Sequence, residues 1–351
     1  MAQSARSHFA SLWVILFTWG AGVAFSETLL AEADPEVNRL SREVAGKGWI
    51  AFSARTELGD WDIWICRPDG TDKRNLTHTP GFNEGYPLFS REGTQLLYRQ
   101  LPKSEAFDGN RHGEQGVLVL ANSDGSGSKI MEGEWPWASW SPDGKELACL
   151  SLRGISIREV ASGKERLLVK RQGFFQQLTW SPAGSWFSGV SNAFGTGWSV
   201  GKINVTTGET RAVSAVDCCT PDWFPDGKKI IFSKRMSGPA LHQGYGWTQL
   251  WMAREDGTDA RLVYAEEGRH IYGGHVSPDG NYVLFTGNAE EDGDPSRAGA
   301  PMSLMRVSDA PIIAGLDKAA DAKAKSGPVL KLPHGWEPCW TFSETPGHAK
   351  P

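Results

Sequence analysis

The sequence lacks the short motifs that mark several common enzyme classes. No Cys-x-x-C pair occurs, so a zinc knuckle or a thioredoxin-like redox site is unsupported. No glycine-rich phosphate loop occurs, which argues against a nucleotide-binding enzyme. No run of lysines and arginines occurs either, and the net charge is −5. This charge does not favour nucleic acid as a partner, and no nucleic-acid binding is expected.

A long hydrophobic run is present only at the N-terminus. Phe9 to Phe25 is uncharged and mostly apolar, it follows Arg6, and Ala24-Phe25-Ser26 offers small residues for cleavage. This pattern predicts a secretory signal peptide over residues 1–26 and a periplasmic or secreted protein. The alternative is an uncleaved anchor, because the run is at the lower limit of what spans a bilayer. If the signal is cleaved, the protein is not an integral membrane protein.

Cysteine is scarce, and the five that occur are an odd number. In an oxidising compartment at least one is therefore expected to be unpaired or to pair between chains. Cys66, Cys149 and Cys339 fall inside predicted strands, where a buried and inert thiol is the common outcome.

A recurring turn is the most informative feature that the sequence does contain. Its copies are Trp140-Ser141-Pro142-Asp143-Gly144, Trp180-Ser181-Pro182-Ala183-Gly184, Trp223-Phe224-Pro225-Asp226-Gly227, Val276-Ser277-Pro278-Asp279-Gly280 and the degenerate Phe89-Ser90-Arg91-Glu92-Gly93. Successive glycines are 51, 40, 43 and 53 residues apart, which is the length of a four-stranded propeller blade. Ser, Pro, Asp and then Gly predict a type I turn with a bulge between two antiparallel strands.

The strand that enters each turn is predicted to be the innermost strand of a blade. These strands are Tyr86 to Ser90, Trp137 to Ser141, Gln177 to Ser181, Pro221 to Phe224, Gly274 to Ser277 and Pro338 to Phe342. The first unit, which starts at Trp49, has no innermost strand of its own, and the last of these strands has no unit after it. The sequence therefore predicts an all-β fold, a six-bladed β-propeller in which the C-terminal strand completes the first blade. Closing the ring in this way removes exposed sheet edges.

The repeat resembles that of the TolB-like propeller family. The shared features are an aromatic before Ser-Pro-Asp-Gly, and Ile63-Trp64 followed by Pro68-Asp69-Gly70 and Leu76-Thr77. The resemblance covers residues 48–342 and implies a binding platform with a partner linked to the cell envelope. TolB also has an α/β domain ahead of its propeller, whereas residues 27–47 here are long enough only for a linker or one short helix.

Two short segments flank the predicted propeller. Pro35 to Val44 could form a helix, with Asp34 as its N-cap and proline at its first position. Residues 343–351 are expected to be a disordered tail.

Candidate site residues lie on the connections into the innermost strands. These connections open on the face that also carries irregular inserts, one of them expected over Lys234 to Gly246. The residues predicted to bind a ligand there are Glu84, Tyr86, Trp135, Trp137, Gln177, His275 and Glu337. Aromatic rings with a few polar groups suit a protein segment or a glycan at the mouth of the central channel. The alternative for Tyr86 and Trp137 is packing between blades.

Two classes of function remain open. The first is an exported binding platform for a protein segment or glycan, with no catalytic residue and no cofactor. The second is a metal-dependent polysaccharide lyase or hydrolase, because oligogalacturonate lyases have related repeats and a divalent metal in the channel. His275 and His334 would then be among the metal ligands, although no His-x-His or His-Glu-x-x-His spacing supports them.

Overall fold

The computed structural model describes residues 34–108, 111–214, 216–240, 246–266, 268–288, 300–311, 315–316 and 327–348. The predicted signal peptide lies outside these residues. Strands form most of the regular structure of the described part, and α1 (Pro35–Val44) is its single α-helix. None of its helices is long and apolar enough to cross a membrane.

The strands form antiparallel sheets that follow chain order. They are β1 (Trp49–Arg55), β2 (Trp61–Cys66), β3 (Arg74–Asn75), β4 (Phe82–Phe89), β5 (Gln95–Pro102), β6 (Val117–Asn122), β7 (Lys129–Ile130), β8 (Ser139–Trp140), β9 (Glu146–Leu150), β10 (Ile155–Glu159), β11 (Glu165–Val169), β12 (Phe174–Trp180), β13 (Trp186–Ser191), β14 (Ser199–Asn204), β15 (Thr210–Ala212), β16 (Cys218–Trp223), β17 (Lys229–Ala240), β18 (Gly246–Arg254), β19 (Arg261–Tyr264), β20 (His270–Val276), β21 (Tyr282–Asn288), β22 (Ala300–Arg306) and β23 (Leu330–Thr341). Four sheets have four strands each, and a fifth has seven in the order β20-β21-β22-β23-β1-β2-β3.

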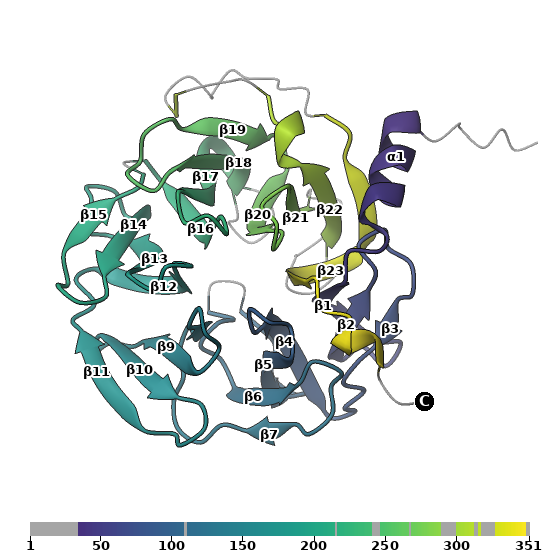
Figure 1. Cartoon of the computed structure of the whole chain (residues 1–351), viewed down its shortest axis with the longest axis horizontal. Coiled ribbons are helices and arrows are strands. Elements are labelled where there is room, and N and C mark those ends of the chain that lie inside the picture. The colour runs from purple at the N-terminus through teal and green to yellow at the C-terminus, as the bar shows by residue number, and fades with distance from the viewer. Residues whose placement is uncertain are drawn as a thin grey trace, which may run out of the picture. The chain divides into compact units, whose positions relative to one another are not determined.

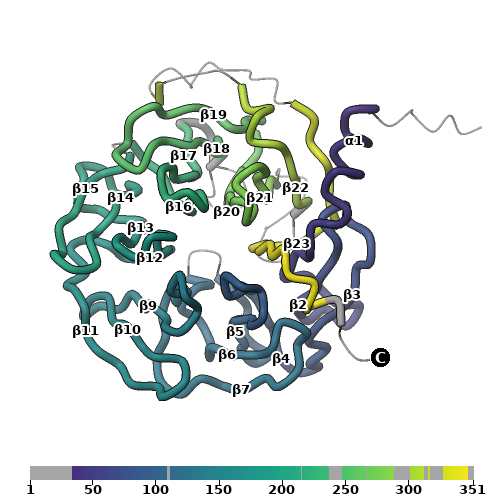
Figure 2. Tube along the Cα trace, in the orientation of Figure 1, coloured from purple at the N-terminus to yellow at the C-terminus, as the bar shows by residue number. Residues whose placement is uncertain are grey.

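The seven-stranded sheet closes the ring through one shared strand. Up to Gly335, β23 pairs with β22, and from Trp336 onward it pairs with β1. If β23 is counted as two strands that meet at this point, the seven-stranded sheet consists of two four-stranded units. The other four sheets bring the number of units to six. Figure 1 shows these units around a central axis, with β23 beside β1, and the trace in Figure 2 follows the same path. The predicted β-propeller, completed by its C-terminal strand, is confirmed.

The recurring turns form as their residue types predict. Ser141 Oγ donates to Asp143 Oδ1 at 2.7 Å and accepts from the backbone N–H of Glu146 at 2.9 Å. Gly144 has a φ of +69°, which only glycine adopts without strain. Because the side-chain bonds satisfy the turn backbone, each turn is a fixed corner between an innermost strand and the next one.

Helix α1 covers the place where the first and last units meet. Asp34 Oδ1 accepts from the Glu36 N–H at 2.9 Å, so the predicted cap is present. Leu40 and Val44 are fully buried in a core cluster with side chains of β1, β22 and β23. Arg306 of β22 forms an ion pair of 2.7 Å with Glu43. The helix therefore adds apolar and ionic contacts to the closure.

Two expectations about irregular segments need correction. The insert Lys234 to Gly246 was expected to be an irregular loop, but β17 and β18 extend into it, with Ala240 paired to Gly246. Residues 343–348, expected to begin a disordered tail, include a 3-10 helix over Thr345–His348. Glu344 there pairs with Arg67 of the first unit at 2.7 Å. Backbone pairing with β18 accounts for the strand structure at the end of β17. The ion pair with Arg67 holds the residues after β23 against the first unit.

The closure generates the first testable prediction. Trp340 is 3% exposed, contacts the rings of Tyr282 and Phe342, and donates from Nε1 to Lys47 O at 2.7 Å. Trp340→Ala should lower the free energy of unfolding by about 3–5 kcal/mol, because it leaves a cavity where the two ends of the ring meet. Urea denaturation measures this, with Leu152→Ala as the control. Leu152 is 84% exposed, so its loss should have little effect.

Candidate functional site

A bulge in the innermost strands sets the geometry of the channel. One residue near the start of each innermost strand has positive φ: Tyr86, Trp137, Gln177, Thr220, Gly273 and Glu337, with values from +49° to +62°. In β4, β12, β16, β20 and β23 the pairing register shifts just there. An extra residue of this kind interrupts the ladder and redirects the side chains that follow.

The bulges also join neighbouring units. The Tyr86 N–H donates to Ser53 Oγ of the first unit at 3.2 Å. The Thr220 N–H donates to Gln177 Oε1 of the preceding unit at 2.6 Å. Backbone groups released from one ladder are thus satisfied by the unit before it, so the ring needs its polar side chains at these positions.

A channel of about 360 Å³ lies inside the ring. At one level it is lined by the bulge residues other than Trp137, together with His112. At the other end it is lined by the recurring turns, including Pro142, Pro182, Pro225 and Pro278. Between these levels lie the residues two positions after each bulge: Leu88, Ser139, Thr179, Asp222, His275 and Cys339. The channel therefore has a middle ring built from one side chain of each unit.

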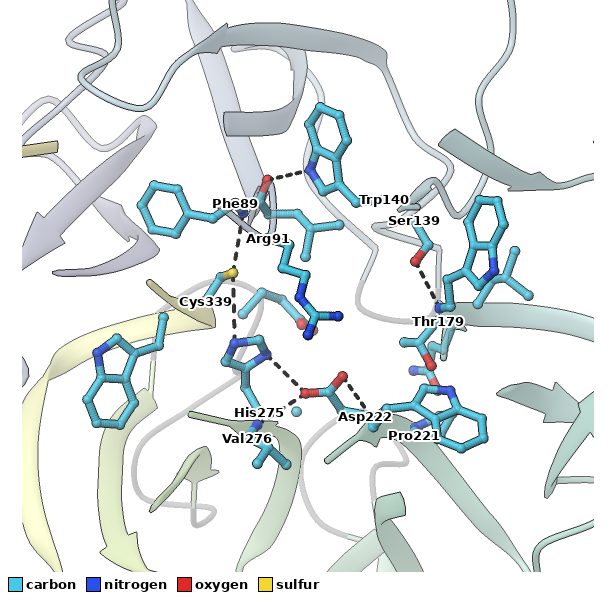
Figure 3. A pocket seen from close by; sticks show the side chains of 18 of the residues that line it. Phe89, Arg91, Ser139, Trp140, Thr179, Pro221, Asp222, His275, Val276 and Cys339 are labelled. Atoms are coloured by element: carbon cyan, nitrogen blue, oxygen red, sulfur yellow. Dashed lines mark hydrogen bonds and ion pairs between the residues drawn. The ribbon is translucent and has the colours of Figure 1, made fainter. Parts of the chain in front are cut away.

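His275 links two of its neighbours in this middle ring. Its Nδ1 lies 3.2 Å from Asp222 Oδ2, and its Nε2 lies 4.0 Å from Cys339 Sγ (Figure 3). Asp222 is fixed in turn, since Oδ2 also accepts from the Val276 N–H at 3.1 Å. The Phe89 N–H donates to Cys339 Sγ at 3.3 Å. Four innermost strands thus contribute to one chain of polar contacts.

The environment raises the pKa of His275 well above its usual value. Burial acts to lower this pKa, but the adjacent Cys339 and Asp222 favour the imidazolium and outweigh the effect of burial. The carboxylate of Asp222 holds Nδ1, so Nε2 is directed at the sulfur. This arrangement can keep a proton between the imidazole and the thiol of Cys339.

A second histidine lies at the bulge level. His112 Nε2 is 3.1 Å from Glu337 Oε1, and the His112 ring lies against Tyr86, Trp137 and Trp336. Burial raises the pKa of the Tyr86 hydroxyl, so this group stays protonated. The bulge end of the channel therefore offers the rings of Tyr86 and His112 with one carboxylate, and Trp137 and Trp336 pack behind these rings.

An arginine stands at the turn end. Arg91 occupies the place that proline takes in the complete turns, and its Nη1 lies 3.5 Å from Pro182 O of a different unit. Figure 3 shows the Arg91 side chain extending into the pocket. The channel thus has a cation at one end and the carboxylate of Glu337 at the other.

Four of the seven predicted ligand-binding residues line the channel, namely Tyr86, Gln177, His275 and Glu337. Trp137 lies beside it but is 2% exposed and packs in the core between units, which was the alternative interpretation. Trp135 is also 2% exposed, with Arg158 stacked 4.0 Å from its ring centre. Both tryptophans are therefore structural, because the register of their connections turns the indoles into the blades.

Glu84 also does not line the channel. It is fully buried in β4, where Gln100 Nε2 donates to its Oε1 at 2.8 Å. Burial raises the pKa of this carboxyl group. Its position before the bulge directs it into the interior of the blade, and it has no surface for a ligand.

The structure does not bring the two proposed metal ligands together in the channel. His334 is exposed on β23, opposite Pro301, and is not a lining residue. Both ring nitrogens of His275 face Asp222 and Cys339. Within the described ranges, no group of three His, Cys, Asp or Glu side chains is placed to hold a metal ion.

The sequence reasoning missed Asp222, Cys339 and Arg91. A signal for Asp222 and Cys339 was present in the sequence. In every unit, the residue two positions before the serine of the recurring turn, or before the residue in its place, lines the channel. Pro87, Pro221 and Pro338 inside predicted innermost strands were a second signal, since proline within a sheet is confined to edges and bulges.

The fold is a β-propeller with a central channel, and solved structures of TolB proteins share this fold. The chain is similar to TolB from Acinetobacter baumannii, with 15% identity, a TM-score of 0.59, and coverage of 85% of this chain and 67% of TolB. It is also similar to a putative TolB from Agrobacterium tumefaciens, with 18% identity, a TM-score of 0.52, and coverage of 76% and 87%. At these identities the likeness establishes the fold alone.

Sequence comparison adds one curated relative and no family model. No family model matches the chain. An uncharacterized protein of Agrobacterium fabrum is 27% identical over 126 residues, which are 33% of this chain and 42% of that protein. The chain therefore matches less than half the length of this relative.

The contacts of His275 predict its titration. Its ring should titrate well above the ordinary pKa of about 6.5, and Asp222→Asn should lower that pKa by removing the facing carboxylate. NMR of the imidazole Cε1–H across pH measures both. A wild-type midpoint at or below the ordinary value would contradict the arrangement.

The same contacts predict how stability depends on pH. Because the folded pKa is raised, protonated His275 adds stability that is fully present below about pH 6.5 and is lost as pH rises through the folded pKa. The stability difference between wild type and His275→Gln should therefore shrink with rising pH. Urea unfolding at a series of pH values measures it, and a constant difference would contradict the prediction.

Proposed function

We propose that this protein is an exported β-propeller binding platform, periplasmic or secreted, whose channel receives a protein segment or a glycan. The observation that carries the proposal is the bulge end of the channel, where Tyr86, Gln177, His112 and Glu337 converge. An aromatic wall with a few polar groups in a preformed concavity is the usual character of a ligand site. The partner of such a platform would belong to the cell envelope, as the likeness to TolB suggests.

The position of Glu337 supports a polar contact with the ligand. The carboxylate lines the channel, and His112 is its side-chain partner at 3.1 Å in the described part of the chain. Its side chain is 13% exposed, so a ligand group bonded to it would be largely shielded from water. Hydrogen bonds to charged groups in such places contribute more than neutral ones.

The alternative, a metal-dependent polysaccharide lyase or hydrolase, has no comparable observation in its favour. It was based on His275 and His334 as metal ligands, and only His275 lines the channel. The binding platform is supported by residues that line the channel.

A binding experiment with defined probes tests the platform. The full chain is screened against a glycan array and a peptide library, and each bound probe is titrated against wild type and variants by calorimetry. Glu337→Gln should weaken a channel ligand about tenfold or more, because it removes a shielded charged hydrogen bond. Tyr86→Ala should weaken it through lost contact area.

Glu165→Gln is the matched control for this experiment. It removes the same charge from the exposed outer strand β11 and should leave affinity unchanged. Peptide and glycan probes separate the two ligand classes. If no probe binds, or if all bound probes ignore both channel substitutions, the platform proposal is wrong.

A further inference from the structure

The contact between Cys339 and His275 has no part in the proposed binding function. It places a thiol, an imidazole and a carboxylate in line, with 4.0 Å from Cys339 Sγ to Nε2 and 3.2 Å from Nδ1 to Asp222 Oδ2 (Figure 3). A base adjacent to a thiol, with a third group that orients the base, is the general arrangement of an activated sulfur nucleophile. The three residues come from β23, β20 and β16, so only the closed ring assembles them.

Position in the channel distinguishes Cys339 from the other cysteines. All five are described, and all are free and buried, with exposed fractions between 0% and 8%. Only Cys339 lines the channel. Burial raises the pKa of Cys66 and Cys149 to about 12 and that of Cys219 to about 11, which makes them inert. Cys219 is 8% exposed against 4% for Cys339, so exposure alone does not favour Cys339.

The backbone also supports a negative charge on Cys339. The Phe89 N–H donates to Sγ at 3.3 Å, on β4 of the neighbouring unit. A thiolate there would receive this N–H and the Nε2–H of a protonated His275. The other charged or titratable side chains that line the channel are Arg91, His112, Tyr86 and Glu337.

We propose that Cys339 is a site of reversible oxidation by small hydroperoxides that enter the channel, with His275 as its proton relay and Asp222 as the residue that positions the relay. Small peroxides suit the site because the sulfur is nearly buried and admits only a compact reactant. The assignment is independent of the proposed binding function.

The chemistry balances within these residues. In the reactive form the proton of the Cys339 thiol resides on His275 Nε2, and the thiolate sulfur attacks the hydroxyl oxygen of the hydroperoxide. A sulfur–oxygen bond forms as the oxygen–oxygen bond breaks, and the leaving oxygen takes the proton from His275. The products are a cysteine sulfenic acid and water, or an alcohol from an organic hydroperoxide. The sulfur is oxidised and the peroxide is reduced, and a thiol reductant of the compartment would reverse the step.

Site-resolved trapping tests this on the full chain. The protein is treated with hydrogen peroxide at pH 6.5 in the presence of dimedone, and adducts are quantified at all five cysteines by peptide mass spectrometry. An ordinary thiol of pKa about 8.5 is only about 1% thiolate at this pH. Because His275 Nε2 lies 4.0 Å from its sulfur, Cys339 should react about tenfold or more faster than Cys219, which has no imidazole partner among the described residues. If Cys339 and Cys219 of the wild-type protein are trapped at equal rates, the proposal is wrong.

Variants then test the relay. His275→Gln should slow trapping at Cys339 about tenfold or more at pH 6.5 and move its pH profile toward that of an ordinary thiol. Asp222→Asn should do the same to a smaller extent. Thr179→Val, which alters a middle-ring side chain two units from β20, is the control and should leave the rate unchanged. If folded His275→Gln reacts as fast as wild type, access alone explains the reactivity and the relay is wrong.

Discussion

The channel depends on the way β23 divides its backbone hydrogen bonds between two units. Its first half continues the sheet of β22, and its second half supplies the innermost strand for β1. Without this division, the first unit would have an open inner edge and the last unit an open outer one. The strand also carries Glu337 and Cys339, so the hydrogen bonds that close the ring also place two channel residues. Stability and site geometry therefore depend on the same pairing.

The bulges explain how a meander of ordinary strands can have a polar centre. Each innermost strand takes one residue into positive φ and then directs the residue two places later inward. Repetition of one local distortion gives six inward positions whose residue types are free to differ. The ring holds Leu88 and the hydroxyls of Ser139 and Thr179 on one side and Cys339, His275 and Asp222 on the other. The backbone sets the positions, and the side chains set the chemistry.

Much of the fold could be predicted because it follows from local rules. The Ser-Pro-Asp-Gly turns, the spacing of the units and the capped helix over Pro35 to Val44 are properties of neighbouring residues, and all appear as expected. The lining of the channel was predicted in part. Tyr86, Gln177, His275 and Glu337 line it, whereas Glu84, Trp135 and Trp137 are buried elsewhere. Glu84 and Trp135 precede the bulges by two residues, and Trp137 is itself a bulge residue. At such places a change of one position reverses the face that a side chain occupies.

The sequence alone determined the propeller, its repeating unit and the completion of the first unit by the C-terminal strand, since these require only turn chemistry and periodicity. Tertiary structure decided which side chains share the channel. Asp222, His275 and Cys339 are separated by 53 and 64 residues along the chain, and their shared position relative to the turn does not show which of the six inward residues are neighbours. Their contact arises because the ring closes and each bulge turns one side chain toward the same axis. A long-range constraint of this kind acts on the folded ring as a whole, and no segment of the sequence expresses it by itself.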